Sequence, residues 1–312
     1  MDKNVSLQIS LAPPDYRHTI HLLSHQIKVF SSQVEEILLT YDTHKSNGRF
    51  STNWEEDNIK MWDFLKQLSL TNPKIRLIKI DYSQQKIKAV ANFFFRRTKI
   101  PAKDWRGGPF YTYFFGLYEA KSPNVFHIDS DLFFGGLSKT WLDEALKLYN
   151  DDENILFINP LAGPPMENDI LHHQKYLYYR NMPRHYAFST VSTRLFFVNK
   201  YRLAANPILN ISTFKLGELL RAIFRKNPPF KLPEEILSEH MQKHNMIRVD
   251  FKGQQEGLWS LHPPYRTPKF YKELPKLIQR IECNDMPDSQ RGHYDIIDEL
   301  FDWSEARNKL KF

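Results

Sequence analysis

Apolar residues recur along this chain of 312 residues in two alternating patterns, short unbroken runs and runs at helical spacing. The short runs predict strands and the helically spaced runs predict helices. In the first half, the predicted strands are 5–11, 34–41, 75–80 and 124–128, and the predicted helices are 18–30, 54–70, 87–96 and 110–120. Polar residues follow the strand ends. This order predicts an α/β fold with a doubly wound, mostly parallel sheet flanked by helices, and with ligands at the carboxyl edge of the strands.

The second half of the chain changes its period. Here we predict helices at 141–149 and 233–244, strands at 155–159, 188–198 and 247–251, and a chain that turns away at 200–204. Residues 267–312 are charged and amphipathic, so we expect a C-terminal helical extension there. His172 and His173 are neighbours, and adjacent residues point to different faces of a helix. We therefore expect them on the surface and not at a metal.

An acidic triplet, Asp129-Ser130-Asp131, ends the predicted strand 124–128. Carboxylates at the end of a buried strand are costly unless a positive group neutralises them. Mg²⁺ or Mn²⁺ does so through oxygen ligands; alternatively, Asp129 caps a turn and Asp131 is solvated. Gly135-Gly136 follows, and this glycine pair would let the backbone turn closely past a ligand. The apolar strand and the glycines together favour the metal site.

Charge and composition narrow the class of partner. A formal charge of +7 and a pI near 9.2 favour an anionic partner, but the basic residues are dispersed, which disfavours nucleic acid. The single cysteine, Cys283, excludes an internal disulfide and fits a reducing cytoplasm. With no signal peptide and no long apolar run, we expect a cytoplasmic protein. Peripheral contact of the basic C-terminal helix with the inner face of a membrane stays open.

Two common nucleotide-binding signatures are absent from the sequence. No G-x-G-x-x-G turn follows the first predicted strand, which disfavours a dinucleotide-binding fold. No G-x-x-x-x-G-K-[ST] loop is present either, so the chain is not a P-loop enzyme. Any signal for nucleotide binding therefore lies in the acidic triplet.

The order of these features resembles the GT-A glycosyltransferases, and among them the inverting family-two type. The features are the four strand–helix units, the triplet at a strand end, the acidic pair Glu234-Glu235 opening a later helix, and His262 beyond it. The resemblance covers roughly residues 5–266. It implies a GT-A-like domain at 1–266, with a nucleotide-sugar half at about 1–136 and an acceptor half at about 137–266, followed by the extension at 267–312.

The resemblance also implies where a nucleotide lies. The turn after the first strand, with Pro13, Asp15 and Tyr16, stands where the family has a polar turn that meets the base. Asp42 ends the second strand, where the family often holds an aspartate that contacts the base or ribose. Asn92 stands where the family often has an Arg-Asn pair, although the preceding residue here is alanine.

For the chemistry, the resemblance implies a Mn²⁺ or Mg²⁺ ion that stabilises the leaving pyrophosphate. Asp131 is the expected direct ligand, and Asp129 is expected on the ribose or on the metal through water. His262 is a candidate further ligand; packing as a buried histidine beside Trp259 is the alternative. Glu235 occupies the position of the catalytic base, with Glu where the family usually has Asp. Complementing the helix dipole is the alternative role of Glu235.

The sequence thus predicts a metal-dependent, inverting hexosyltransferase. Its donor would be a nucleotide-diphosphate sugar, UDP- or GDP-linked, and its acceptor a hydroxyl of a glycan, a lipid-linked acceptor or a protein. A retaining GT-A transferase would keep the acidic triplet and use no base. A nucleotidyltransferase usually has a glycine-rich basic loop after the first strand, where this chain has Ala12-Pro13-Pro14-Asp15. A non-enzymatic carbohydrate-binding or scaffolding protein is the last alternative, which the intact triplet disfavours.

Overall fold

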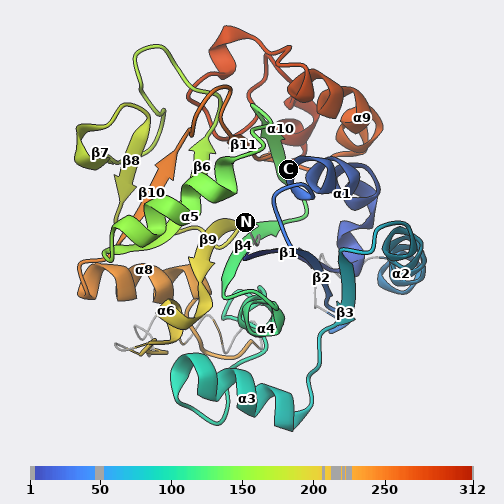
Figure 1. Cartoon of the computed structure of the whole chain (residues 1–312). Helices are drawn as coiled ribbons and strands as arrows, with labels where there is room; N and C mark the ends of the chain where they lie inside the picture. The colour runs from blue at the N-terminus through green and yellow to red at the C-terminus, as the bar shows by residue number, and fades with distance from the viewer. Residues whose placement is uncertain are drawn as a thin grey trace.

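A mixed sheet runs through the centre of the molecule, with strands in the order β3-β2-β1-β4-β9-β6-β10-β8-β7 (Figure 1). This computed structural model describes residues 4–45, 53–205, 208–211, 219, 222 and 227–310. The strands are β1 (Val5–Leu11), β2 (Glu36–Tyr41), β3 (Ile75–Lys79), β4 (Asn124–Asp129), β6 (Ile155–Ala162), β7 (Leu177–Tyr178), β8 (His185–Phe188), β9 (Leu195–Asn199) and β10 (Ile247–Phe251). Two short strands, β5 (Phe133–Gly135) and β11 (Trp259–Leu261), pair with each other, and β11 also pairs with β6.

The strand directions confirm the predicted sheet. β1 pairs in parallel with both β2 and β4, and β2 pairs in parallel with β3. β9 runs antiparallel to β4 and β6, and β6 then pairs in parallel with β10. β8 is antiparallel to both β10 and β7. Along the described path only β8 and β9 oppose the common direction, so the sheet is mostly parallel.

Helices cover both faces of this sheet (Figure 1). They are α1 (Tyr16–Phe30), α2 (Trp54–Thr71), α3 (Gln84–Phe95), α4 (Tyr111–Glu119), α5 (Trp141–Asp151), α6 (Lys200–Ala204), α8 (Pro233–Lys243), α9 (Pro268–Glu282) and α10 (Ser304–Leu310). One core cluster packs α1, α2 and α5 against the sheet, and a second packs α3, α4, α6 and α8. Val125 and Phe126, neighbours on β4, belong to opposite clusters, because successive strand residues point to opposite faces. The predicted doubly wound architecture is therefore confirmed.

One prediction for the middle of the chain is wrong. Residues 188–198 do not form one strand, because β8 ends at Phe188 and β9 begins at Leu195. The two apolar ends of this run pair with different strands, since β8 pairs with β10 whereas β9 pairs with β4. Residues 200–204 form a helix, α6, whose first turn is capped by the side chain of Asn199.

The C-terminal extension is only partly helical, which corrects the prediction for 267–312. Between α9 and α10, residues 283–303 contain a single 3-10 turn (Asp288–Gln290), and Pro287 and Gly292 interrupt any longer helix. α9 buries an apolar face against β5 and β11. No helix in the described ranges is long and apolar enough to cross a membrane.

Close glycine contacts fix the extension and the segment after β4. At Gly163, with φ +100°, an added Cβ would lie 2.3 Å from the carbonyl oxygen of His293, so the stretch 293–295 lies against the end of β6. At Gly135 an added Cβ would overlap the ring of Trp259, and at Gly136 it would lie 2.5 Å from the carbonyl oxygen of Gly257. The prediction that this glycine pair makes room for a ligand is therefore wrong, since it makes room for protein atoms.

Candidate functional site

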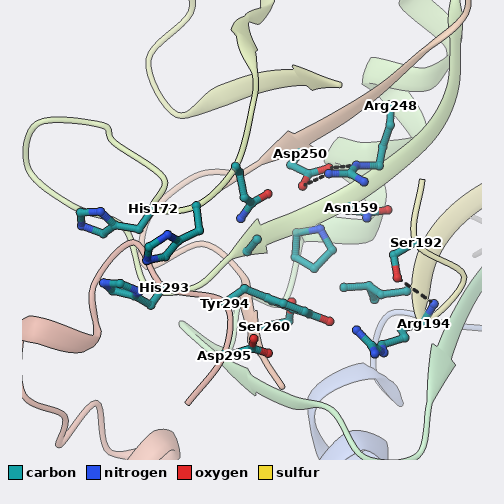
Figure 2. A pocket seen from close by; sticks show the side chains of 15 residues that line it. Asn159, His172, Ser192, Arg194, Arg248, Asp250, Ser260, His293, Tyr294 and Asp295 are labelled. Carbon is teal, nitrogen blue, oxygen red and sulfur yellow. Dashed lines mark hydrogen bonds and ion pairs between the residues drawn. The ribbon is translucent and has the colours of Figure 1, made fainter. Parts of the chain in front are cut away.

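Three cavities open along the carboxyl edge of the parallel strands, and Arg194 lines all of them. The β2 cavity, about 400 Å³, is lined by residues that include Leu11, Asp42, Lys103, Gly108 and Tyr113. The central cavity, about 670 Å³, is lined by residues that include Arg17, Asp131, His262, Arg266 and Tyr271. The β10 cavity, about 280 Å³, is lined by residues that include Asn159, Ser192, Arg248, Asp250, Tyr294 and Asp295 (Figure 2).

The acidic triplet lies where the β2 cavity and the central cavity meet, as both are lined by Asp129 and Asp131. Asp131 is almost fully buried, and its Oδ2 contacts the guanidinium of Arg266. The other oxygen, Oδ1, is buried without a hydrogen-bond partner. Ser130 is held by the buried His18, whose Nε2 lies 3.0 Å from the serine hydroxyl. The triplet is therefore fixed in place, and one carboxylate oxygen is left over for a ligand.

His262 lies beside this carboxylate. Its Nε2 is 3.8 Å from Oδ2 of Asp131, and its Nδ1 is 2.9 Å from Oδ1 of Asp295. A carboxylate on one ring nitrogen orients the other nitrogen, an arrangement that metal-binding histidines use. However, no group of three His, Cys, Asp or Glu side chains within the described residues could hold a metal ion by itself. A cation here would need further ligands from a bound molecule.

The turn after β1 contributes one acid to the site. Asp15 lines both the β2 and the central cavity, and its Oδ2 accepts a hydrogen bond from the backbone N–H of Ala12 at 2.9 Å. Burial raises the pKa of the Asp15 carboxyl to about 6, although Arg266 opposes this shift. Pro13 is buried and Tyr16 begins α1, and neither is among the residues that line the three cavities.

Asp42 is held by three donors at the far end of the β2 cavity. Its Oδ1 accepts hydrogen bonds from the hydroxyl of Tyr82 at 2.9 Å and from the backbone N–H of His44 at 2.8 Å. Its Oδ2 accepts one from Nζ of Lys103 at 3.2 Å. Asp42 therefore stands in a preorganised polar pocket at the end of β2, and its contact with a nucleoside stays a prediction.

Two other predicted site residues lie outside these cavities. Asn92 is exposed on α3. Glu235 lies in the first turn of α8, where its Oε2 accepts a hydrogen bond from the backbone N–H of Leu232 at 3.1 Å. This bond caps the helix. Its neighbour Glu234 is half-buried, and burial raises the pKa of that carboxyl while the nearby Arg194 lowers it. The roles assigned to Asn92 and Glu235 stay predictions.

The β10 cavity contains residues that the sequence did not single out. Arg248 donates from Nε and Nη2 to the two carboxylate oxygens of Asp250, at 2.7 and 3.1 Å.

His172 and His173 lie in a turn and not in a helix, so the reasoning that placed them on opposite helix faces is wrong. Both histidines line this cavity, and His172 stacks on His293 with ring centroids 4.3 Å apart.

Only distant similarities connect the chain to known proteins. No protein-family model and no curated protein matches it. Among solved structures it is similar to residues 1–349 of S. aureus TarS, with TM-score 0.40 and 13% identity over 83% of this chain and 60% of that one. It is similar to an active-site mutant of LgtC with TM-score 0.37 and 10% identity, over 92% of this chain and 99% of that one. It is similar to mouse xyloside xylosyltransferase 1 with TM-score 0.37 and 11% identity, over 78% of this chain and 83% of that one. At this level of similarity, what those proteins bind or transfer stays a property of those proteins.

Proposed function

We propose that the protein is a glycosyltransferase that moves a hexosyl group from a nucleotide-diphosphate sugar to an acceptor hydroxyl. The observation that carries this proposal is that three cavities meet at Arg194, next to the carboxylates at the end of β4. A donor laid along them would have its nucleoside in the β2 cavity and its diphosphate in the central cavity. Its sugar would then lie at Arg194, facing the β10 cavity.

The central cavity has guanidiniums that can bind a diphosphate, and a divalent cation would offset the charge of the carboxylates that also line it. Arg17, Arg194 and Arg266 all line it, and a guanidinium can donate two parallel hydrogen bonds to phosphate oxygens. Burial raises the pKa of the Asp15 carboxyl to about 6, so this acid is protonated more readily than an ordinary aspartate, and the protonated form repels the phosphates less. The nucleoside would then contact Asp42 and Lys103.

The residues at the end of β4 fit a divalent cation that also binds the donor. Asp131 and His262 would hold Mn²⁺ or Mg²⁺, with Asp129 on the ribose or on the ion through water. Support comes from the unpartnered Oδ1 of Asp131 and from Asp295, which orients the ring of His262. Phosphate oxygens would complete the ligand shell. When bound, the ion would stabilise the charge that develops on the leaving diphosphate.

In the inverting reaction, the acceptor oxygen attacks the anomeric carbon of the sugar. The bond from that carbon to the phosphate oxygen breaks, and the nucleoside diphosphate leaves with the electron pair. The acceptor's hydroxyl proton passes to a carboxylate, for which Glu235 is the predicted base. Glu234 is the alternative base, because Arg194 acts on its carboxyl and lowers the pKa that burial raises.

A retaining transferase is the second candidate. It is favoured by the capping hydrogen bond between Glu235 and Leu232, which gives Glu235 a structural role that needs no catalysis. Both candidates keep the donor arrangement. They differ in the anomeric configuration of the product, which NMR of the purified product determines directly.

The test is a panel of UDP- and GDP-sugars with Mn²⁺, read by calorimetry and by release of the nucleoside diphosphate. We expect one nucleotide class to bind and its sugar to be released slowly to water. Absence of binding by every member of the panel would overturn the proposal. A cytoplasmic location, with α9 near the inner face of a membrane, remains part of the proposal and is checked by cell fractionation.

A further inference from the structure

We infer that the β10 cavity is the acceptor site and that it takes an uncharged, hydroxyl-rich ring, a sugar or a cyclic polyol. This inference rests on the proposed function and names the class of its second substrate. The cavity lies at the ends of β6 and β10, with Arg194 at one side (Figure 2). In the strand order, β2 lies on the other side of β9, the strand that Arg194 precedes. A ligand there would meet the transferred sugar at Arg194, the residue that all three cavities share.

The lining is a built polar site. Asn159 is 6% exposed, Asp250 1% and Ser260 0%, so these polar side chains are buried around the cavity. The Oδ1 atom of Asn159 is buried without a hydrogen-bond partner. A buried amide oxygen without a partner is unusual in a folded protein, and a ligand hydroxyl or a water would satisfy it. Figure 2 shows Asn159 beside the Arg248–Asp250 pair, with the ring of Tyr294 below them.

The charge of the cavity selects an uncharged ligand. Two guanidiniums, Arg194 and Arg248, face two carboxylates, Asp250 and Asp295, and these formal charges cancel. Burial lowers the pKa of the His293 imidazole, and the neighbouring His172 and His173 lower it further, so the neutral form of His293 is favoured. A phosphorylated acceptor would therefore find no net attraction in this cavity.

The types of side chain favour hydroxyl groups. A hydroxyl both donates and accepts, and the cavity offers amide, carboxylate and guanidinium groups that together do both. Tyr294 and the stacked His172–His293 pair add flat ring faces, against which the C–H groups of a sugar ring can pack. The volume of about 280 Å³ is suited to a single ring.

The test uses the full chain, the nucleotide sugar that binds in the panel above, and three groups of acceptor probes. The first group is the methyl glycosides of neutral hexoses together with myo-inositol. The second is hexose 6-phosphates, and the third is a serine- and threonine-containing peptide. Mass spectrometry of the products gives the rate for each probe. We expect transfer to at least one neutral probe, and slower transfer to its phosphorylated form and to the peptide.

Asn159→Leu tests the site itself. Losing the amide should raise KM for the neutral acceptor by about tenfold or more, because a hydrogen bond inside the cavity is lost. Donor binding and donor hydrolysis to water should be unchanged, since the donor lies on the other side of Arg194. Asn159→Ala, which also removes the amide, serves if Asn159→Leu does not fold. Asn308→Leu, at an exposed position of α10, is the control and should match wild type.

The outcomes separate this inference from the proposed function. Preference for a phosphorylated or peptide acceptor, or an unchanged KM in both Asn159 variants, overturns the inference while donor hydrolysis still supports the proposed function. No transfer to any neutral probe by an enzyme that hydrolyses its donor also overturns it. Failure to bind or hydrolyse any nucleotide sugar overturns the proposed function first.

Discussion

The backbone N–H of Asp129 donates a hydrogen bond to the carbonyl oxygen of Arg194 at 2.8 Å. This bond continues the antiparallel pairing of β4 with β9 by one residue, because Ile128 pairs with Leu195 just before it. The carboxylates of Asp129 and Asp131 follow from the end of β4, and the guanidinium of Arg194 comes from the residue just before β9. Both therefore lie at the same point of the sheet edge. Arg194 is placed there by the backbone, and its side chain faces all three cavities.

Arg194→Met should weaken donor binding and slow transfer together. A charge-assisted hydrogen bond to phosphate is lost, so we expect the dissociation constant of the bound nucleoside diphosphate to rise roughly tenfold. The backbone bond to Asp129 does not depend on the side chain, so the fold should be kept. Calorimetry gives the affinity, and Arg97→Met, at an exposed position after α3, is the control. Wild-type affinity in the Arg194 variant would place the diphosphate elsewhere.

Asp131→Asn should abolish donor-dependent activity while leaving the folded state intact. The substitution removes the negative charge that would hold the cation, and the amide can still fill the same space. Activity assays with and without Mn²⁺, and with excess EDTA, measure the effect. Asp143→Asn, on the exposed face of α5, is the matched control. Full turnover by the Asp131 variant, or by wild type in EDTA, would rule out the metal assignment.

The sequence predicted the parts of the site that follow from a single strand and its end. Asp129, Asp131 and Asp42 each come directly after an apolar run, and parallel strands bring such ends to one edge of the sheet. For Asp15 and Asp42, the roles near a nucleotide came from the resemblance to the GT-A family and stay predictions. The local pattern alone gives only their position at the ends of strands.

The residues that the sequence missed depend on contacts between distant segments. Arg194 was hidden inside 188–198, which has the composition of one strand although the structure divides it between two. Tyr294 and Asp295 fall in a stretch predicted to be helical, and contacts between distant segments, such as the close approach of Gly163 to His293, bring them to the end of β6. Glu235 shows a different limit, because an acid in a first helical turn has the same sequence signal whether it caps the helix or acts as a base.

Asp42→Ala should weaken nucleotide binding by about 1 kcal/mol or more, since a hydrogen bond to the base or ribose is lost. The matched control is Asp81→Ala, because Asp81 follows β3 as Asp42 follows β2, and Asp81 is exposed outside the three cavities. Calorimetry with the nucleoside diphosphate compares the two variants. If Asp42→Ala binds like wild type, the nucleoside is not in the β2 cavity.

Asp15→Asn should change how stability depends on pH. The pKa of Asp15 is raised from 3.8 to about 6 by burial, so its protonated form stabilises the fold. That contribution is fully present below about pH 4 and is lost as the pH rises through 6. The side chain is 32% exposed, so after allowing for solvent screening we expect the variant to be more stable than wild type by about 1–2 kcal/mol at pH 8.

Near pH 4 the Asp15→Asn variant and wild type should have similar stability, because both side chains are then uncharged. Unfolding in urea at several pH values measures the difference directly. A difference in stability that does not vary between pH 4 and pH 8 would contradict the raised pKa. The comparison isolates Asp15, since every other titrating group is common to both proteins.

Glu235→Gln tests whether Glu235 is the catalytic base or only caps helix α8. Glutamine at this helix position can still accept the hydrogen bond from the N–H of Leu232, so the stability of the fold should hardly change. It cannot take a proton, so if Glu235 is the base, turnover should fall by roughly 10²–10⁴-fold with donor affinity unchanged. Glu234→Gln is the matched partner and should have much less effect, because adjacent helical residues point about 100° apart.

The reverse result, a large loss of turnover in the Glu234 variant alone, would move the base to Glu234. Wild-type turnover by both variants, with a product that keeps the donor's anomeric configuration, would replace the inverting mechanism with the retaining one.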